Sequence, residues 1–226
     1  MHMRSCYRGS FARLLGDDAL KGSKLTKQEG DFIDFLVTDK KQDNFLSYCN
    51  EIVLPINPQE TIKKYTEHTT EHYARVNLSL ASDSDKLQEY GDYITQLRNS
   101  IFSQAFLDDA IVYRGVELSK LEVDKMEELG QFFIPSFTST SLESNKAYSK
   151  NAMMIIKIPY ASQYACSITG NLSNYFNEER EVLLSCYSAF RLERIEVVNN
   201  TKFITLLLDD HLSSMNSIFP HAKTFC

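Results

Sequence analysis

The first half of the chain carries a pattern of hydrophobic and polar positions that is typical of amphipathic helices. From Asn57-Pro58 onward, apolar or aromatic side chains return every three or four residues, which places them on one face of a helix. The positions of this series are Ile62, Tyr65, Thr69, Tyr73, Val76 and Leu80. Proline is well accepted in the first helical turn, so Pro58 marks a beginning. We therefore expect one helical segment from this point to Leu80.

A second helical series follows a break in the pattern. Ser82-Asp83-Ser84-Asp85 holds the residue types that end one helix and cap the next through their side chains. Apolar positions then return at helical spacing from Tyr90 to Ile101. An earlier helix start is indicated by Thr26-Lys27-Gln28-Glu29, which has the form of a capping box. Residues 26–105 are therefore predicted to be helical.

The character of the sequence changes near Ala110, where short β-branched and aromatic runs replace the helical spacing. Such runs, bounded by turn residues, are typical of strands. Strands are expected over 111–114, 132–134, 137–140, 153–158, 181–184, 190–198 and 203–208, with a short helix over 121–129. Helices followed by strands indicate an α+β fold rather than an alternating α/β fold.

These patterns predict one domain with short extensions. Residues 1–25 are expected to form an N-terminal arm, and residues 213–226 a C-terminal tail. The domain between them, 26–212, would have a helical part over 26–105 and a β-rich part over 110–210.

Composition narrows the classes of function. The chain has 226 residues, 43% of them hydrophobic and 24% charged, which suits one globular domain. A net charge of −6 and the lack of a Lys/Arg-rich stripe argue against a nucleic-acid partner. No apolar run approaches the roughly 20 residues that a membrane-spanning helix needs. The five cysteines form no C-x-x-C pair, so we expect buried thiols or at most two bridges. Secreted and cytoplasmic locations both stay open.

Three short motifs in the β-rich half carry candidate chemistry. In Tyr113-Arg114-Gly115, the arginine can bind a phosphate or carboxylate with two hydrogen bonds, and the glycine lets a flat ligand approach the backbone. Phe137-Thr138-Ser139-Thr140-Ser141 is a hydroxyl-rich strand that places Ser139 and Ser141 on one face. Glu179 and Glu181 would also share a face, roughly 7 Å apart.

Each motif alone has a plain structural explanation. Arg114 could form a surface ion pair, and a second Tyr-Arg-Gly occurs at Tyr7-Arg8-Gly9 in the predicted arm. The Thr/Ser run fits an ordinary half-exposed strand, and the acidic run fits a solvated loop. However, like charges side by side on an ordered strand are unfavourable unless a site uses them to stabilise a cation.

Taken in order, the three motifs resemble the Arg/Ser-Thr-Ser/Glu-x-Glu class of mono-ADP-ribosyltransferases, which includes vertebrate ecto-enzymes and clostridial-type toxins. The resemblance covers roughly residues 55–210. In the helical half, Tyr65-Thr66, Tyr73 and Asn77 are similar to the N-terminal helices of the eukaryotic branch. The resemblance implies a helical layer packed on a split β-sandwich, with NAD in the cleft between two small sheets.

The resemblance also implies roles for the residues that bind NAD as the substrate. Arg114 would contact a phosphate or ribose, and Gly115 would bond the nicotinamide amide through its backbone. Ser139, with Thr140 and Ser141 beside it, would hold the nicotinamide ribose and orient Glu181.

Further roles concern catalysis and the acceptor. Glu181 matches the catalytic glutamate, and Glu179 matches the acid that marks arginine-directed transfer in this family. Tyr175 and Phe176 match the loop that meets the acceptor protein. The loop 142–151 would fold over nicotinamide, where Lys146 and Lys150 could touch the pyrophosphate. No metal is expected, and the implied partner is a protein with an accessible arginine.

The implied chemistry is physically reasonable. Breaking the bond from ribose to nicotinamide builds positive charge on the ribose, as in glycoside hydrolysis. A carboxylate at position 181 would interact more strongly as that charge develops. A guanidinium, with a pKa above about 12, is a poor nucleophile and needs a second carboxylate to activate it. The spacing of roughly 7 Å resembles the about 6.5–9.5 Å between the two acids of inverting glycosidases.

Three alternatives stay open. His68-Thr69-Thr70-Glu71-His72 fits the H-x-x-E-H pattern of a zinc peptidase, with Glu143 as a possible third ligand. The same fold could act chiefly as an NAD glycohydrolase, with water as the acceptor. It could also bind NAD without turnover.

Overall fold

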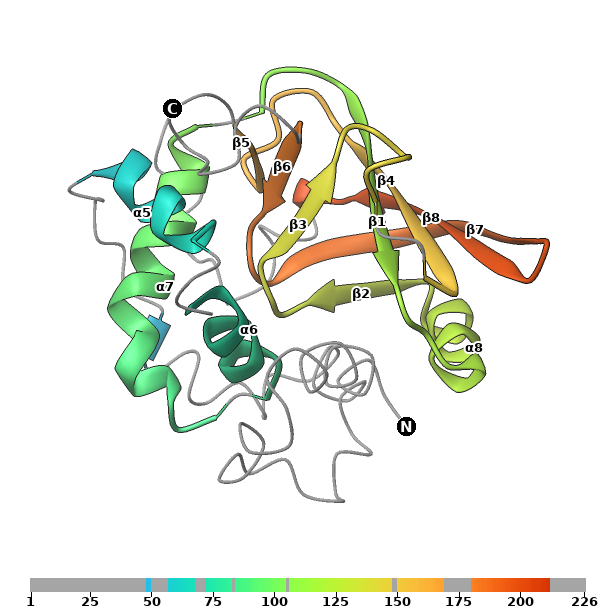
Figure 1. Ribbon diagram of the computed structural model, residues 1–226, viewed down its shortest axis with the longest axis horizontal. Helices are drawn as coiled ribbons and strands as arrows, with labels where there is room; N and C mark the ends of the chain where they lie inside the picture. Colours follow the sequence, from blue (N-terminus) through green and yellow to red (C-terminus); the bar gives the residue numbers. More distant parts are fainter. Residues whose placement is uncertain are drawn as a thin grey trace.

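The computed structural model describes residues 48–49, 57–67, 72–82, 84–104, 106–147, 150–168 and 180–211. Within these ranges the chain has the α+β architecture that the sequence predicts, with helices first and a mixed sheet afterwards (Figure 1). The predicted N-terminal arm, the capping box at Thr26 and the predicted C-terminal tail lie outside the described residues.

The expected single helix up to Leu80 is two helices, α5 (Pro58–Tyr65) and α6 (His72–Ser82). Asn57 caps the start of α5 by accepting from the Glu60 N–H at 3.2 Å. Thr66 forms the C-cap of α5, and its hydroxyl donates to the Lys63 carbonyl at 2.9 Å. A threonine side chain that bonds the preceding turn competes with helix continuation, which explains why the apolar period alone was misleading.

The next helix, α7 (Leu87–Phe102), confirms the second apolar series. The expected side-chain cap is wrong, because Lys86 occupies the N-cap position and makes no side-chain cap hydrogen bond. The Leu87 N–H instead donates to the Ser84 carbonyl at 3.0 Å, so the backbone itself closes this turn.

The strands form an eight-stranded sheet in the order β2-β7-β8-β4-β1-β3-β6-β5. The strands are β1 (Ala110–Val116), β2 (Gln131–Ile134), β3 (Thr138–Ser141), β4 (Ala152–Ile158), β5 (Ala165–Ile168), β6 (Glu181–Leu184), β7 (Ser188–Val198) and β8 (Thr201–Leu208). Among the strands of the described residues, β4 and β8 are the pair that runs parallel. The short helix α8 (Lys120–Leu129) lies between β1 and β2, as predicted. Strand β5 was not predicted, because its four residues are too few to show a clear alternation of apolar and polar positions.

The sheet has two parts that meet at one narrow junction. Strands β2, β7, β8, β4 and β1 form the larger part, and β3, β6 and β5 form the smaller part. Between β1 and β3 the register contains the single pair Tyr113↔Ser141. In Figure 1 the smaller part lies between the helices α5–α7 and the larger part. This junction corresponds to the split that the family resemblance implies.

One hydrophobic core runs through the helices and the sheet. Phe102 at the end of α7 packs edge-on against Tyr164, with ring centroids 5.0 Å apart, next to the start of β5. Among the described residues no helix combines the length and the apolar character that crossing a membrane requires.

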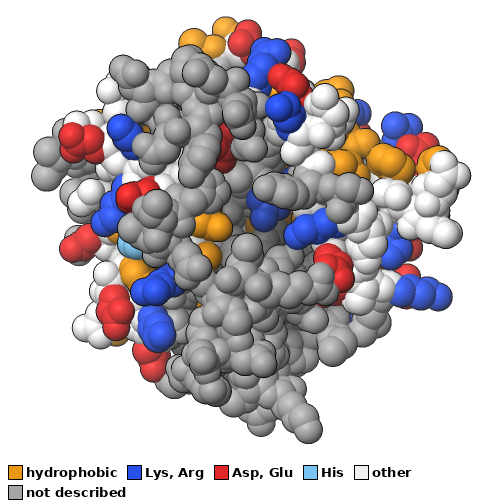
Figure 2. All heavy atoms as spheres, in the orientation of Figure 1, with side chains coloured by type: hydrophobic (Ala, Val, Ile, Leu, Met, Phe, Trp, Pro, Cys, Tyr) orange, Lys and Arg blue, Asp and Glu red, His pale blue; other side chains and the backbone are white. Residues whose placement is uncertain are grey.

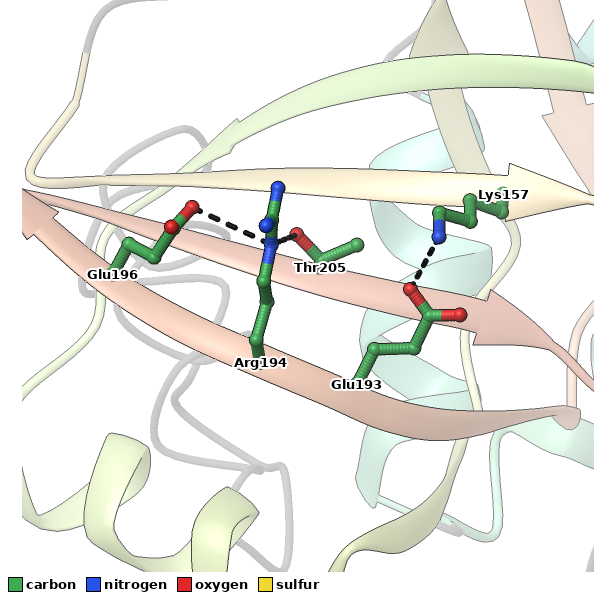
Figure 3. Close-up of polar contacts among 5 residues, drawn as sticks. All are labelled: Lys157, Glu193, Arg194, Glu196 and Thr205. Atoms are coloured by element: carbon green, nitrogen blue, oxygen red, sulfur yellow. Dashed lines mark hydrogen bonds and ion pairs between the residues drawn. The ribbon is translucent and has the colours of Figure 1, made fainter.

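The long β7–β8 hairpin has a solvated, charged face. Lys157 on β4 pairs with Glu193 on β7 at 2.6 Å (Figure 3). Arg194 contacts Glu196 at 3.4 Å and the Thr205 hydroxyl at 3.4 Å on the same face. Exposed pairs of this kind contribute about 0–1 kcal/mol each, so they mark a solvent surface. On the face in Figure 2, positive and negative side chains are interspersed rather than gathered by sign.

Candidate functional site

The fold brings the three candidate motifs together on the adjacent strands β1, β3 and β6. Tyr113 on β1 lies opposite Ser141 on β3, and Ser141 lies opposite Glu181 on β6. Directly opposed residues share a face of the sheet, and so do alternate residues along a strand. Ser139, Ser141 and Glu181 therefore lie on one face.

Arg114 on β1 is attached to β3 through its guanidinium. Its Nη1 donates to the Ser139 carbonyl at 2.7 Å. Its Nε is buried and makes no hydrogen bond within the described residues. The neighbouring Gly115 is half-buried and pairs with Met153 on β4. The guanidinium is thus held against the serine strand, and its Nε–H has no hydrogen-bond partner among the described residues.

The hydroxyl groups of β3 have different environments. Thr140 donates to the Val182 carbonyl at 2.7 Å, and Ser141 accepts from the Glu143 N–H at 3.0 Å. These two hydroxyls therefore stabilise the strand and the turn after it. Ser139 is half-buried, on the same face as Glu181.

Glu181 begins β6 and is half-buried. The backbone before it is fixed, because the Leu142 N–H donates to the Arg180 carbonyl at 2.9 Å. The negative charge of Glu181 also affects Cys166, a buried residue on the adjacent strand β5. Burial, together with this charge, raises the pKa of the Cys166 thiol to about 12. Cys166 and Cys186 are buried and form no disulfide bond within the described residues, which agrees with the prediction that they are packed thiols.

Tyr65 and Asn77 of the helical layer also reach the site, although the sequence placed them only in the helical part of the resemblance and not among the site residues. The Tyr65 hydroxyl lies 3.4 Å from the Phe137 carbonyl and receives the Asn77 amide at 2.7 Å. Burial raises the pKa of the Tyr65 hydroxyl. The hydrogen bond from Asn77 and the charge of Arg114 oppose this shift, whereas the charge of Glu181 adds to it. The Tyr65 hydroxyl therefore senses the charges of Arg114, in the first motif, and Glu181, in the third motif. A polar Asn on a largely buried helix was the available signal, although position alone did not reveal its partner.

Several predicted site residues lie outside the described residues or at the surface. Glu179, Tyr175 and Phe176 belong to the part that the structure does not describe. Lys146 and Lys150 are exposed, on either side of the undescribed residues 148–149. Their predicted roles stay predictions.

The histidine pattern gains no support from the described part of the chain. Helix α6 begins at His72, while His68 and Glu71 lie outside the described residues. The His72 ring packs edge-on against Tyr93 at 4.6 Å and Tyr90 at 5.8 Å. Glu143 is half-buried in the turn after β3. No group of three His, Cys, Asp or Glu side chains that could hold a metal occurs among the described residues.

Comparison with known proteins identifies the family of the chain. A family model described as ADP-ribosyltransferase exoenzyme matches residues 41–213. No curated protein matches the sequence.

Solved structures with similar folds include C3stau2 from S. aureus with NAD, at 17% identity and a TM-score of 0.54 over 75% of this chain and 94% of that chain. The Clostridium limosum C3 exoenzyme gives 18% identity and a TM-score of 0.55, covering 76% and 94%. Plx2a, an ADP-ribosyltransferase toxin from Paenibacillus larvae, gives 15% and 0.54, covering 85% and 96%. At these identities the solved structures establish the fold alone.

Proposed function

Because the chain belongs to the ADP-ribosyltransferase exoenzyme family, we propose that it transfers ADP-ribose from NAD to arginine side chains of target proteins and releases nicotinamide. The observation that carries this proposal is the meeting of Arg114, Ser139 and Glu181 on three adjacent strands. This arrangement supplies a cation for the phosphates, a hydroxyl for the ribose and a carboxylate for the developing positive charge.

NAD would bind along the strands that carry these residues. The guanidinium of Arg114 is held by the Ser139 carbonyl through Nη1, and its other terminal N–H groups would bind a phosphate or ribose oxygen. The backbone of Gly115 would form hydrogen bonds with the nicotinamide amide. A flat ligand can approach this backbone closely because glycine has no side chain. The presence of NAD in the structure of the S. aureus relative supports this assignment.

The carboxylate of Glu181 would act on the bond between ribose and nicotinamide. As that bond breaks, its electron pair leaves with nicotinamide and positive charge builds on the ribose. A carboxylate bonded to the ribose 2′-OH interacts more strongly with this cationic sugar than with bound NAD. Glu181 therefore stabilises the transition state selectively.

Arginine is the proposed acceptor because Glu179 precedes Glu181 by two residues. A guanidinium must lose a proton as its nitrogen forms the new bond to ribose C1′, and the Glu179 carboxylate would accept that proton. Tyr175 and Phe176, just before it, would contact the target protein. This motif and the similar helical half favour the arginine-specific, ecto-enzyme-like branch.

Agmatine, a small arginine analogue, provides the direct test. After incubation with NAD, mass spectrometry should find an ADP-ribose adduct on its guanidine group. The mass spectrum of a target protein mixture should place the same modification on arginine. Nicotinamide release without any adduct would instead identify an NAD glycohydrolase. NAD binding without nicotinamide release would identify a binding module.

A further inference from the structure

The outer half of β7 is a sheet edge with one open side. Residues 188–191 of β7 pair with β2, and the Gly130 carbonyl then accepts from the Leu192 N–H at 2.7 Å. Beyond Leu192, β8 is the one strand of the described residues that pairs with β7. In Figure 1 the β7–β8 hairpin projects from the side of the sheet that lies away from α5 and α7. An edge of this kind is a template for pairing with another strand.

The turn at the tip of the hairpin determines which backbone groups face the open side. Asn199 and Asn200 have φ of 50° and 65°, as in a two-residue type I′ turn. In such a turn the Val198 carbonyl accepts from the Thr201 N–H, so these two residues form a hydrogen-bonded pair. Hydrogen-bonded and non-hydrogen-bonded pairs alternate along antiparallel strands. Counted back from Val198, Ile195 is in a pair of the second kind, so its N–H and carbonyl point away from β8 to the open side.

Opposite charges alternate along this edge. Arg194 and Glu196 lie on the same face of β7, and their side chains contact each other at 3.4 Å (Figure 3). These side chains are 62% and 52% exposed. Ile195 between them lies on the opposite face, where it packs against the core. The edge therefore presents one positive and one negative side chain on either side of a residue with open backbone groups.

The charges favour one register for pairing two copies of this edge. When identical antiparallel strands are related by a two-fold axis, one residue lies opposite its own copy. With Ile195 at that position, each Arg194 faces a Glu196, and opposite charges across a strand pair are favourable. With Arg194 or Glu196 at that position, each faces its own like charge. With Val197 there, each Glu196 faces Val198, and the charges gain no partner.

We propose that this edge binds a second copy of the chain, with two β7 strands paired antiparallel around a two-fold axis at Ile195. Arg194 of each copy lies opposite Glu196 of the partner subunit. Ile195 exchanges both of its open backbone hydrogen bonds across the axis. Each copy uses its one open β7 edge, so the assembly closes as a dimer.

This inference goes beyond the proposed function and does not rest on it. In the sheet order, β8 and β4 separate β7 from β1, so the interface includes none of the motif strands. The paired segment is short, and interfaces below about 1,200 Å² belong to weak or transient assemblies. The dimer dissociation constant is therefore expected to lie between roughly 10 μM and 1 mM.

Sedimentation equilibrium of the whole chain tests the proposal, over concentrations from about 10 μM to 1 mM that span the expected dissociation constant. The weight-average mass of the wild type should rise with concentration toward twice the monomer mass and stop there. A wild type that stays monomeric over this range would overturn the proposal, and a mass that rises beyond the dimer would contradict the closed pairing.

Arg194→Glu and Glu196→Arg are complementary variants at exposed positions, where the fold tolerates substitution. Each variant alone places like charges opposite each other at two places, so its dimer dissociation constant should rise at least about tenfold. An equimolar mixture of the two should associate about as strongly as the wild type, because the glutamates of one chain face the arginines of the other. Within each chain the like charges persist in the mixture, so the recovery reports the pairs between chains.

Lys157→Glu is the matched control. Lys157 is also exposed on this face and pairs with Glu193 at 2.6 Å, but it lies on β4, inside the sheet. Its dimer dissociation constant should equal that of the wild type. An Arg194→Glu variant that associates as strongly as the wild type, or a mixture that associates no more strongly than its two components, would show that β7 is not the interface.

Discussion

The guanidinium of Arg114 on β1 donates through Nη1 to the carbonyl oxygen of Ser139 on β3, at 2.7 Å. This contact crosses the junction between the two parts of the sheet, where the register holds only one residue pair. An arginine can make this bond and still present other donors in fixed directions. The proposed anchor for NAD is therefore also a structural link between the first and second motifs.

Arg114→Lys should weaken both roles. A lysine offers one flexible ammonium group, which cannot bond the Ser139 carbonyl and a phosphate in the same fixed geometry. The dissociation constant for NAD should rise at least about tenfold, and the free energy of unfolding should fall by about 1–2 kcal/mol. Calorimetric titration and denaturant unfolding measure the two effects.

Arg191→Lys is the control for that change. Arg191 lies on β7, pairs with Asp209 at 2.5 Å and belongs to none of the three motifs. Its NAD affinity should equal that of the wild type. Equal NAD affinity in Arg114→Lys would contradict the anchoring role.

Glu179→Ala should separate transfer from hydrolysis. The variant keeps Glu181 and so should still break the bond between ribose and nicotinamide, with water as the acceptor. Transfer to agmatine should fall by roughly 100-fold or more, because no carboxylate remains to take the guanidinium proton. Parallel assays of nicotinamide release and agmatine adduct measure the two rates, and an equal loss of both would refute the division of labour.

Gly91→Ala should destabilise the helical layer. A Cβ at Gly91 on α7 would lie 2.2 Å from the Tyr48 carbonyl oxygen, which is backbone and cannot rotate away. Seven residues further along α7, Arg98 Nη1 donates to the Cys49 carbonyl at 2.6 Å. Helix α7 therefore contacts the backbone of both Tyr48 and Cys49. Alanine favours helix by about 1 kcal/mol over glycine, yet the clash should lower the free energy of unfolding by about 1–3 kcal/mol.

Gly130→Ala provides a comparison with a different cause. Gly130 has φ of 63°, and an added Cβ would meet nothing within 4 Å. Its cost should be backbone strain alone, about 1 kcal/mol. Denaturant unfolding measures the free energy of unfolding of both variants. A higher free energy of unfolding for Gly91→Ala than for the wild type would contradict the close approach of α7 to the Tyr48 backbone.

His72 should make stability depend on pH. Burial lowers the pKa of His72, and the charges of Lys64 and Arg75 lower it further. The unfolded state therefore binds a proton more readily, so the stabilising contribution of neutral His72 is complete above about pH 6.5 and is lost as pH falls through the region below it. In denaturant unfolding, wild type should lose more stability than His72→Phe between about pH 7 and pH 5. Parallel curves for the two proteins would contradict this.

The sequence predicted the parts of this fold that depend on local patterns. The helical series around Ile94 and the strand that carries Arg114 follow from periodicity and propensity. The three motifs, which the sequence grouped by their resemblance to one family, lie on strands that the fold places side by side. The break after Tyr65 was missed because Thr66 ends the helix through a hydrogen bond that apolar spacing does not reveal. The link from Asn77 to Phe137 spans 60 residues, so only the tertiary fold could reveal it.

Nicotinamide release by Glu181→Gln tests the central claim most directly. The substitution keeps the size of the side chain and removes the charge that stabilises the cationic ribose. We predict that the wild type releases nicotinamide from NAD and that the folded variant binds NAD but releases nicotinamide at least about 100-fold more slowly. Release at the wild-type rate by the variant, or no release by the wild-type protein, would contradict the account.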